Sequence, residues 1–396
     1  MFEEKLFQME IAKREKLKLE WKYHTKELFK PETISFSPKQ IELIKNLLYT
    51  PIPRHRRKEY WLIASGAKRE MLNNKGYYQS LLKSYPNGTQ CPSEKIIELD
   101  IPRTLPTEPF FKDENNRKKM LNILKAFIKR NSTIGYSQGF NCIVGKLLFV
   151  VGDEEEVFWI FNQIIEHYLP GDFYLLFTGV RKDMKIIQDI IKKTLNYCDQ
   201  SIFMCLDNLI SKTFISLFSR GLPQDLTFLI WDAFFIYGEI ALYRTFIWIA
   251  YLLCKKSLVN KDVEEISQYI NDKMKEIQES GSLNYFLLMY NTINRSNIKK
   301  WKKKYEKSIN NESFLGNNNT NNNVKCDTKM PFCLYNNEER EISKNSKFII
   351  HKMNHEIKLY ENYFFDDLNK NEAKNKDDLN ISQDSLLIQR QKHLCQ

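Results

Sequence analysis

Two side chains in the stretch from residue 91 to residue 148 are candidates for chemistry, Arg103 and Gln138. Arginine carries a permanent charge on a planar fork, so it can donate to two oxygens at once. Glutamine offers a donor and an acceptor on the same amide. Each of the two residues lies where a helical pattern breaks.

The neighbours of both residues predict that they lie at the ends of helices. Arg103 follows Pro102, which cannot sit inside a helix and biases Ile101 toward extended geometry. Gln138 lies just after Gly135, which we expect to be a helix C-cap, and just before an apolar run. We therefore expect Arg103 and Gln138 on a surface that faces a partner.

The composition predicts an all-α fold. The chain has 396 residues, of which 42% are hydrophobic, and only 13 glycines. Its length allows about two to three domains at ~150 residues each. Few glycines and many long side chains favour helices over hairpins. No alternating strand pattern appears before residue 308.

The formal net charge of +11 favours acidic partners such as phospholipid surfaces or acidic proteins. Basic residues are dispersed, with clusters at 54–57 and 299–304. No zinc-finger spacing or RNA-binding signature occurs, so we expect no nucleic-acid binding. The eight cysteines form no CxxC pair and fit reduced thiols in the cytosol. His351 and His355 lack the further ligands of a metal site.

The sequence predicts a protein located in the cytoplasm. Residues 1–30 are charged throughout and lack the apolar core of a secretory signal. The most apolar stretch, 226–254, is interrupted by Asp232, Glu239 and Arg244. A spanning helix needs about 20 apolar residues without such charges. We therefore expect 226–254 to form buried helices.

Local signals predict a series of helices. Ser37, Pro38 and Gln40 form a capping box with proline at the first helical position. A further helix begins at Pro53 and is capped by Gly66. Further helices are expected at 115–130, 157–168, 180–195, 202–218, from Pro223 onward, and at 243–256, 263–279 and 282–293.

Three further residues have an expected structural role. Arg57 and Trp61 are one turn apart and share a helix face, with Trp61 as a core anchor. Arg57 is expected to form a structural ion pair or to touch a partner. Asp232 is an acid within an apolar helix, so it must be paired or hydrogen-bonded if buried. A structural salt bridge or cap is favoured over catalysis.

Four elements in order resemble the TBC domain, the family of Rab GTPase-activating proteins. They are Ile52-Pro53 with Arg57 and Trp61; Ile97, Asp100 and Arg103 with Thr104 and Pro106; Tyr136, Gln138, Gly139 and Asn141; and Leu222-Pro223 with Ile230-Trp231-Asp232. The resemblance covers about 50–254. It departs from the family pattern at Pro51, usually Gly, at Ser137, often Cys, and at Phe140, often Met.

The resemblance implies a multi-helix TBC-type domain at 47–305. An N-terminal helical extension at 1–46 precedes this domain. The polar pattern of 1–30 indicates a solvated lead-in helix that can also pack on the domain, with a role at a membrane surface or a partner as the weaker alternative. After the domain we expect an Asn-rich low-complexity linker at 306–346 and a partly disordered tail with short helices at 347–396. The linker and the tail resemble nothing known to us.

The resemblance also implies a mechanism. An arginine supplied in trans to a GTPase is worth ~10³–10⁵ in the rate of GTP hydrolysis. By this resemblance Arg103 is the arginine finger, and Gln138 is the glutamine finger that positions the attacking water. Four residues would support them, Asp100, Thr104, Tyr136 and Asn141.

The partner implied is a Rab-type small GTPase, with a role in vesicle and membrane traffic. The chain lacks G-x-x-x-x-G-K-[ST], so we expect no cofactor of its own, and GTP and Mg²⁺ would arrive on the partner. Transient association with the surface of endomembranes is a further expectation.

Two alternatives to GTPase activation stay open. The first is a catalytically silent TBC-like scaffold that binds a small GTPase or an effector, although a scaffold has no need of Arg103 or Gln138. The second is an unrelated basic helical adaptor for nucleic acid or lipid, which a steep salt dependence of nucleic-acid binding would support.

Overall fold

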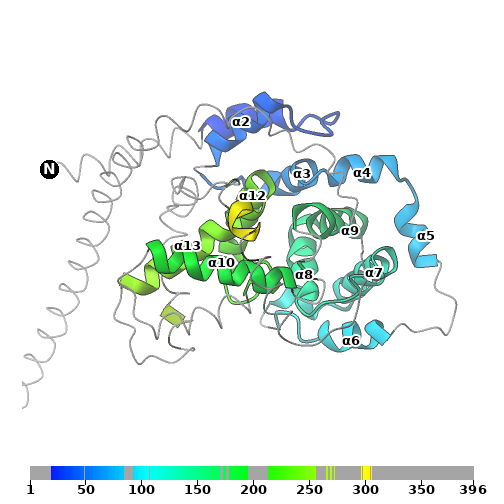
Figure 1. Ribbon diagram of the computed structural model, residues 1–396. Helices are drawn as coiled ribbons and strands as arrows, with labels where there is room; N and C mark the ends of the chain where they lie inside the picture. The colour runs from blue at the N-terminus through cyan, green and yellow to red at the C-terminus, as the bar shows by residue number, and fades with distance from the viewer. Residues whose placement is uncertain are drawn as a thin grey trace, which may run out of the picture. The chain divides into compact units, whose positions relative to one another are not determined.

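The computed structural model describes residues 19–48, 50–83, 92–106, 108–169, 173–174, 178–194 and 213–255, with 265, 268–269, 272, 296, 298–303 and 305. The described residues fold into helices and contain no strand, so the predicted all-α class is confirmed (Figure 1).

The described helices are numbered in chain order. Their bounds are α2 Pro38–Leu47, α3 Arg54–Ala64, α4 Ala67–Asn73, α5 Tyr77–Lys83, α6 Pro92–Asp100, α7 Glu114–Arg130, α8 Phe140–Val151, α9 Glu154–Gln163, α10 Thr178–Thr194, α12 Gln224–Tyr237 and α13 Glu239–Lys255, with a 3-10 helix η1 at Pro109–Lys112 and a π-helix η2 at Ile164–Tyr168.

Helices α7, α8 and α9 pack against one another and form one part of the core (Figure 1). Helix α8 is buried almost all round because its sequence is apolar on every face. Its one charged residue, Lys146, is 2% exposed and donates from Nζ to Thr227 Oγ1 at 2.9 Å. Burial lowers the pKa of the Lys146 ammonium to about 8.

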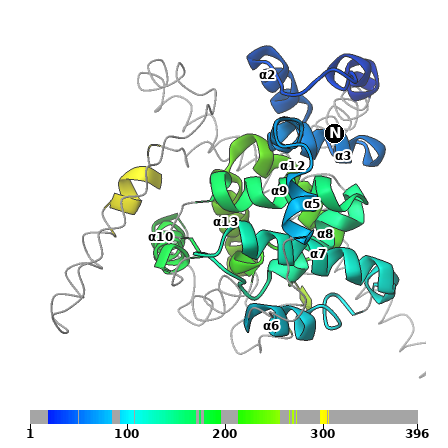
Figure 2. The same cartoon turned by 90° about the vertical axis from the view of Figure 1, so that its right-hand side faces the viewer.

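A second group of helices packs around α12. Helix α12 contacts α3 and α13, and α10 contacts α13 (Figure 2). Residues from Leu226 to Ile236 are buried without interruption, so the burial predicted for this part of 226–254 is confirmed. Helix α3 also contacts α4, α8 and α9, and it thereby joins the two groups.

Several predicted local signals are confirmed. Ser37 caps α2, its side chain and that of Gln40 form the capping box, and Pro38 is the first helical residue. Gly66 follows the end of α3 in the left-handed conformation, with φ +82°. The described end of the N-terminal extension does not stand free in solvent, because Trp21 is 1% exposed and donates from Nε1 to Leu47 O at 3.0 Å.

The prediction that Gly135 caps the preceding helix is wrong. Helix α7 ends at Arg130, and Asn131 is its C-cap. The Asn131 side chain donates to Asn162 Oδ1 at 3.0 Å and to Glu166 Oε1 at 2.9 Å, which fixes the helix end there. Gly135, with φ +65°, instead closes the turn that follows, and its N–H donates to Asn131 O.

Three predicted boundaries also differ. Helix α9 begins at Glu154 rather than residue 157, because Asp153 caps it by accepting from Glu156 N. Its last turn widens into η2. The helix predicted at 202–218 cannot extend to its last residues, because Leu217 and Phe218 have positive φ. Helix α13 begins at Glu239, directly after Gly238 ends α12.

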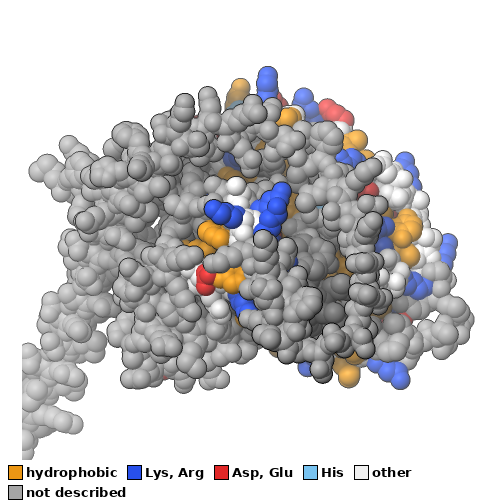
Figure 3. All heavy atoms as spheres, in the orientation of Figure 1, with side chains coloured by type: hydrophobic (Ala, Val, Ile, Leu, Met, Phe, Trp, Pro, Cys, Tyr) orange, Lys and Arg blue, Asp and Glu red, His pale blue; other side chains and the backbone are white. Residues whose placement is uncertain are grey.

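Parts of the predicted organisation lie outside the described residues. They include residues 1–18, most of the helices predicted at 202–218, 263–279 and 282–293, His351 and His355, and the Asn-rich linker and tail. The described part of the basic cluster at 299–304 is helical, with Lys299, Lys300 and Lys303 exposed. Basic side chains gather on the face in Figure 3 over the segment drawn yellow in Figure 1. Within the described residues, no helix has the length and hydrophobicity needed to cross a membrane.

Candidate functional site

Arg103 lies in the turn that follows α6, and its side chain is 63% exposed. Its Nε donates to Asp100 Oδ1 at 2.8 Å, and its Nη2 contacts the same oxygen. Asp100 is the last residue of α6 and is 1% exposed. The buried carboxylate therefore holds one edge of the guanidinium, while the rest of the group faces solvent.

The second oxygen of the Asp100 carboxylate is also bonded. Tyr136 donates from Oη to Asp100 Oδ2 at 2.7 Å. Burial raises the pKa of the Tyr136 phenol, and the Asp100 carboxylate adds to the rise. The phenol therefore keeps its proton and stays a donor. This bond ties the Arg103 turn to the segment that carries Gln138.

A second link between the two segments passes through Thr104 and Asn141. Thr104 Oγ1 donates to Asp100 O at 2.9 Å and accepts from Asn141 Nδ2 at 2.8 Å. Asn141 Oδ1 in turn accepts from Gly139 N at 3.2 Å. The Thr104 and Asn141 side chains are buried. These hydrogen bonds bring together all four residues predicted to support Arg103 and Gln138, namely Asp100, Thr104, Tyr136 and Asn141.

Gln138 directly precedes Gly139, which is the N-cap of α8 with φ +109°. That value lies in the region that glycine adopts without strain. Gln138 is exposed, and its side-chain amide makes no hydrogen bond to any residue that the structure describes. Both its donor and its acceptor are available to a ligand.

Arg103 and Gln138 line one open pocket of about 230 Å³. Its other lining residues include Asp100, Asn141, Cys142, Arg220 and Gly221. An unpaired amide and an arginine with a free edge suit an anionic ligand together with a water molecule. No cluster of His, Cys, Asp or Glu that could hold a metal ion occurs within the described ranges.

Sequence reasoning missed Cys142 and Arg220 in this pocket. Cys142 is a free thiol that is 4% exposed, and burial raises its pKa to about 11, so it is protonated at neutral pH. Arg220 comes from a distant segment, directly before Gly221. The sequence signal that could have indicated Arg220 is its position as a basic residue just before the Leu222-Pro223 motif.

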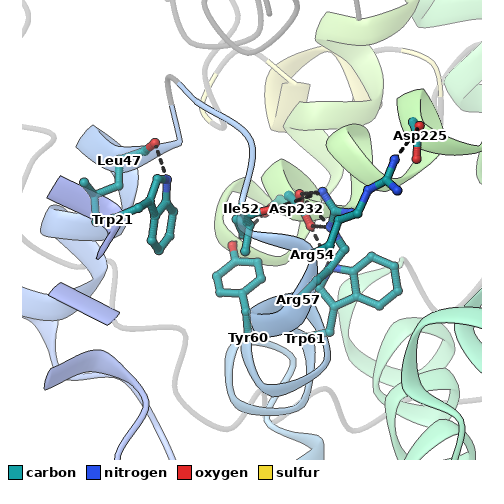
Figure 4. A network of polar contacts seen from close by, with 9 residues as sticks. All are labelled: Trp21, Leu47, Ile52, Arg54, Arg57, Tyr60, Trp61, Asp225 and Asp232. Carbon is teal, nitrogen blue, oxygen red and sulfur yellow. Dashed lines mark hydrogen bonds and ion pairs between the residues drawn. The ribbon is translucent and has the colours of Figure 1, made fainter. Parts of the chain in front are cut away.

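The other three predicted residues lie elsewhere and form one buried cluster (Figure 4). Arg57 and Trp61 extend from α3, and Asp232 extends from α12. Arg57 donates to Asp232 from Nε at 3.1 Å and from Nη2 at 3.0 Å, and Trp61 Nε1 donates at 2.8 Å. None of the three lines the pocket. Arg57 and Asp232 have the geometry of a buried ion pair, and Trp61 adds a hydrogen bond to the same carboxylate.

The sequence of this chain is similar to that of a known protein family. A family model described as the Rab-GTPase-TBC domain matches residues 54–259. Growth hormone-regulated TBC protein 1 of Xenopus tropicalis is 32% identical over 243 residues, which are 59% of this chain and 68% of that protein. GTPase-activating protein gyp2 of Schizosaccharomyces pombe is 28% identical over 213 residues, which are 53% of this chain and only 29% of that protein.

The structure is also similar to a solved one, the crystal structure of the Chlamydomonas flagellar RabGAP TBC domain. The TM-score is 0.57 at 22% sequence identity, over 70% of this chain and 95% of that chain. At this identity the likeness concerns the fold. The helical arrangement expected from the four motifs is thus found in a solved TBC domain.

Proposed function

This chain belongs to the Rab-GTPase-TBC domain family, and we propose that it accelerates GTP hydrolysis by a Rab-type small GTPase. The observation that carries the proposal is the meeting of Arg103 and Gln138 in one pocket, although 34 residues lie between them. A family member named as a GTPase-activating protein, gyp2, is among its relatives.

Arg103 acts in this proposal as a cation supplied in trans. Hydrolysis of GTP spreads negative charge over the oxygens of the transferred phosphoryl group and the leaving group. The free edge of the guanidinium donates to those oxygens, while Asp100 holds the opposite edge. Because Asp100 is buried and Arg103 is not, the side chain is aimed before the partner arrives.

Gln138 acts on the attacking water. Its amide oxygen accepts a hydrogen bond from the water and its amide nitrogen donates to a phosphoryl oxygen, which fixes the direction of attack. Gly139 and Asn141 fix the backbone beside it. Tyr136 and Thr104 keep this segment in register with Arg103.

The nucleotide and Mg²⁺ belong to the partner in this scheme, as its substrate and its metal. The proposed setting is the cytoplasm and the surface of endomembranes, where the protein would regulate vesicle traffic. The net charge of +11 favours transient contact with anionic lipid surfaces.

Single-turnover GTP hydrolysis on a panel of Rab-type GTPases tests the proposal. We expect the full chain to accelerate hydrolysis by at least one member. Arg103→Ala should lower the stimulated rate by about 10³-fold or more, and Gln138→Ala by about 10²-fold, with binding of the GTPase retained. Arg69→Ala, at a half-buried arginine on α4 outside the pocket, is the control and should leave the rate unchanged.

The same assay separates the alternatives. Binding of a GTPase without acceleration by the full chain would support the scaffold, and neither binding nor acceleration would leave only the fold in common with the family. Retention of the full rate by Arg103→Ala would overturn the role of the arginine finger.

A further inference from the structure

Arg220 lines the same pocket as Arg103 and Gln138 and is exposed. Its guanidinium makes no hydrogen bond or ion pair with any residue in the described part of the chain. Arg103 differs, because Asp100 accepts from it. The charge of Arg103 is therefore balanced by a carboxylate, whereas the charge of Arg220 is not.

The segment that carries Arg220 has a strained backbone. The described residues include three non-glycine positions with positive φ, namely Leu105, Leu217 and Phe218. Leu105 lines the pocket, and the other two lie just before Arg220. Left-handed geometry costs a leucine or a phenylalanine free energy, and such strain gathers at functional sites.

Several hydrogen bonds hold this strained segment in place. Trp231 Nε1 donates to Leu217 O at 2.8 Å, and Thr227 Oγ1 donates to Phe218 O at 3.0 Å. The N–H of Phe218 donates to Thr213 O at 2.7 Å. Two of these donors come from α12, so the core of the domain fixes the loop and the position of Arg220.

The Arg220 loop also contacts the segment that carries Gln138. A Cβ added at Gly139 would lie 3.4 Å from Ser216 Cβ, so the two backbones approach closely. Ser216 Oγ accepts from Arg220 N at 3.3 Å. Ser216 therefore contacts both the backbone of Arg220 and the segment that carries Gln138.

The charge of Arg220 acts on the thiol of Cys142, another residue that lines the pocket. The Cys142 thiol lines the pocket, and burial raises its pKa. The positive charge that opposes this rise most strongly is that of Arg220, ahead of Lys146 and Arg103. Among the charged side chains that line the pocket, Asp100 pairs with Arg103, so Arg220 leaves one positive charge unbalanced.

We propose that Arg220 is a second arginine of this site and donates to oxygens of the phosphoryl group that is transferred from the GTP of the partner GTPase. This inference rests on the proposed function, because it concerns the same pocket and substrate. A group that binds Arg103 and Gln138 occupies a pocket of about 230 Å³ that Arg220 also lines. A phosphoryl group in transfer offers oxygens on several sides, so it can accept from two guanidinium groups at once.

The test compares the affinity of the full chain for one GTPase in two states. The partner is loaded with GDP alone, or with GDP and aluminium fluoride, which mimics the transferred phosphoryl group. We expect Arg220→Gln to weaken binding of the aluminium fluoride state by about 10- to 100-fold and of the GDP state by less than about 3-fold. Arg220→Lys should lose less, because it keeps the charge.

Two controls keep the result specific. Arg69→Gln removes the same charge from α4, outside the pocket, and should weaken neither state. Thermal unfolding of Arg220→Gln should match the wild type, because the side chain has no partner among the described residues. The stimulated kcat of Arg220→Gln should fall with little change in KM.

Each contrary result has one meaning. Equal weakening of both states would overturn the assignment to the transferred phosphoryl group, because GDP lacks that group, and would place the contact of Arg220 elsewhere on the loaded GTPase. Affinities of Arg220→Gln equal to those of Arg69→Gln, with normal acceleration by the wild type, would overturn this inference alone. No acceleration of any GTPase by the wild type would overturn the proposed function and this inference with it.

Discussion

Two of the arginine–aspartate pairs in the described part of the chain differ in where the cation lies. In the pair of Arg57 and Asp232 both side chains are buried, with exposed fractions of 7% and 1%. In the pair of Arg103 and Asp100 the carboxylate is equally buried at 1%, but the guanidinium is 63% exposed. The same two residue types therefore make a closed contact in one region and an open one in the other.

The difference lies in the neighbours of each carboxylate. Asp232 accepts from Arg57 and Trp61, which come from a single helix, and its partners leave no edge of the arginine toward solvent. Burial raises the pKa of Asp232, and these donors oppose the rise. Asp100 instead divides its oxygens between Arg103 and Tyr136. A shared carboxylate at a helix end can orient a cation and still leave it free to bind a partner.

The largest effect is expected from Arg57→Ala, which tests whether the closed pair is structural. Removing the arginine leaves the Asp232 charge buried with one donor, Trp61, so the free energy of unfolding should fall by about 3–5 kcal/mol. Denaturant unfolding monitored by circular dichroism measures it. Arg54→Ala is the matched control, because its ion pair with Asp225 also joins α3 to α12 but is exposed, and its loss should cost less than about 1 kcal/mol. Equal losses in the two variants would remove the contrast.

Arg103→Lys tests whether the open pair is functional. Lysine lacks the planar fork, so it cannot bond to Asp100 and to a phosphoryl group with the same geometry. The stimulated rate of single-turnover hydrolysis should fall by about 10²- to 10³-fold, with an unchanged melting temperature. A melting temperature that falls along with the rate would mean that this pair too is structural.

Lys146→Met examines a buried cation that has no carboxylate partner among the described residues. Its pKa is lowered to about 8 by burial, so the folded state disfavours its charge. The variant should be more stable than the wild type by about 1–3 kcal/mol at pH 7. Thr227 keeps a hydrogen bond to Phe218 O, so its hydroxyl stays satisfied.

The gain in stability of Lys146→Met depends on pH. In the unfolded chain the lysine titrates near its ordinary value of 10.5. The penalty of the wild type is complete below about pH 8 and disappears as the pH rises toward 10.5, so the advantage of Lys146→Met should shrink between pH 8 and pH 10. Melting temperatures at pH 7 and pH 9.5 measure it, and a variant less stable than the wild type at both values would contradict the account.

The smallest effect is expected from Tyr136→Phe, which removes one hydrogen bond from Asp100 without changing the ring packing. The stimulated rate should fall by about 3- to 10-fold, corresponding to about 1 kcal/mol. Tyr23→Phe, at a tyrosine that is 79% exposed, serves as the control. An unchanged rate in Tyr136→Phe would show that the Asp100–Arg103 contact needs no support from the second oxygen.

Local sequence rules predicted much of the fold. The capping box at Ser37 and Gln40 acts within one turn, so it was readable without the rest of the molecule. The apolar stretch at 226–254 predicted buried helices, and α12 confirms this over Leu226 to Ile236. The end of α7 was missed because Asn131 is held by Asn162 and Glu166, which no local pattern reveals.

The sequence alone determined the residue types at the site and, through four motifs in order, the family. Tertiary structure decided which of those residues meet. Asp232 pairs with Arg57 across 175 positions, and Arg220 reaches the pocket of Gln138 from a distant loop. The physical reason is range: propensities and caps act over about one helical turn, whereas the meeting of distant side chains depends on how the apolar faces of whole helices pack.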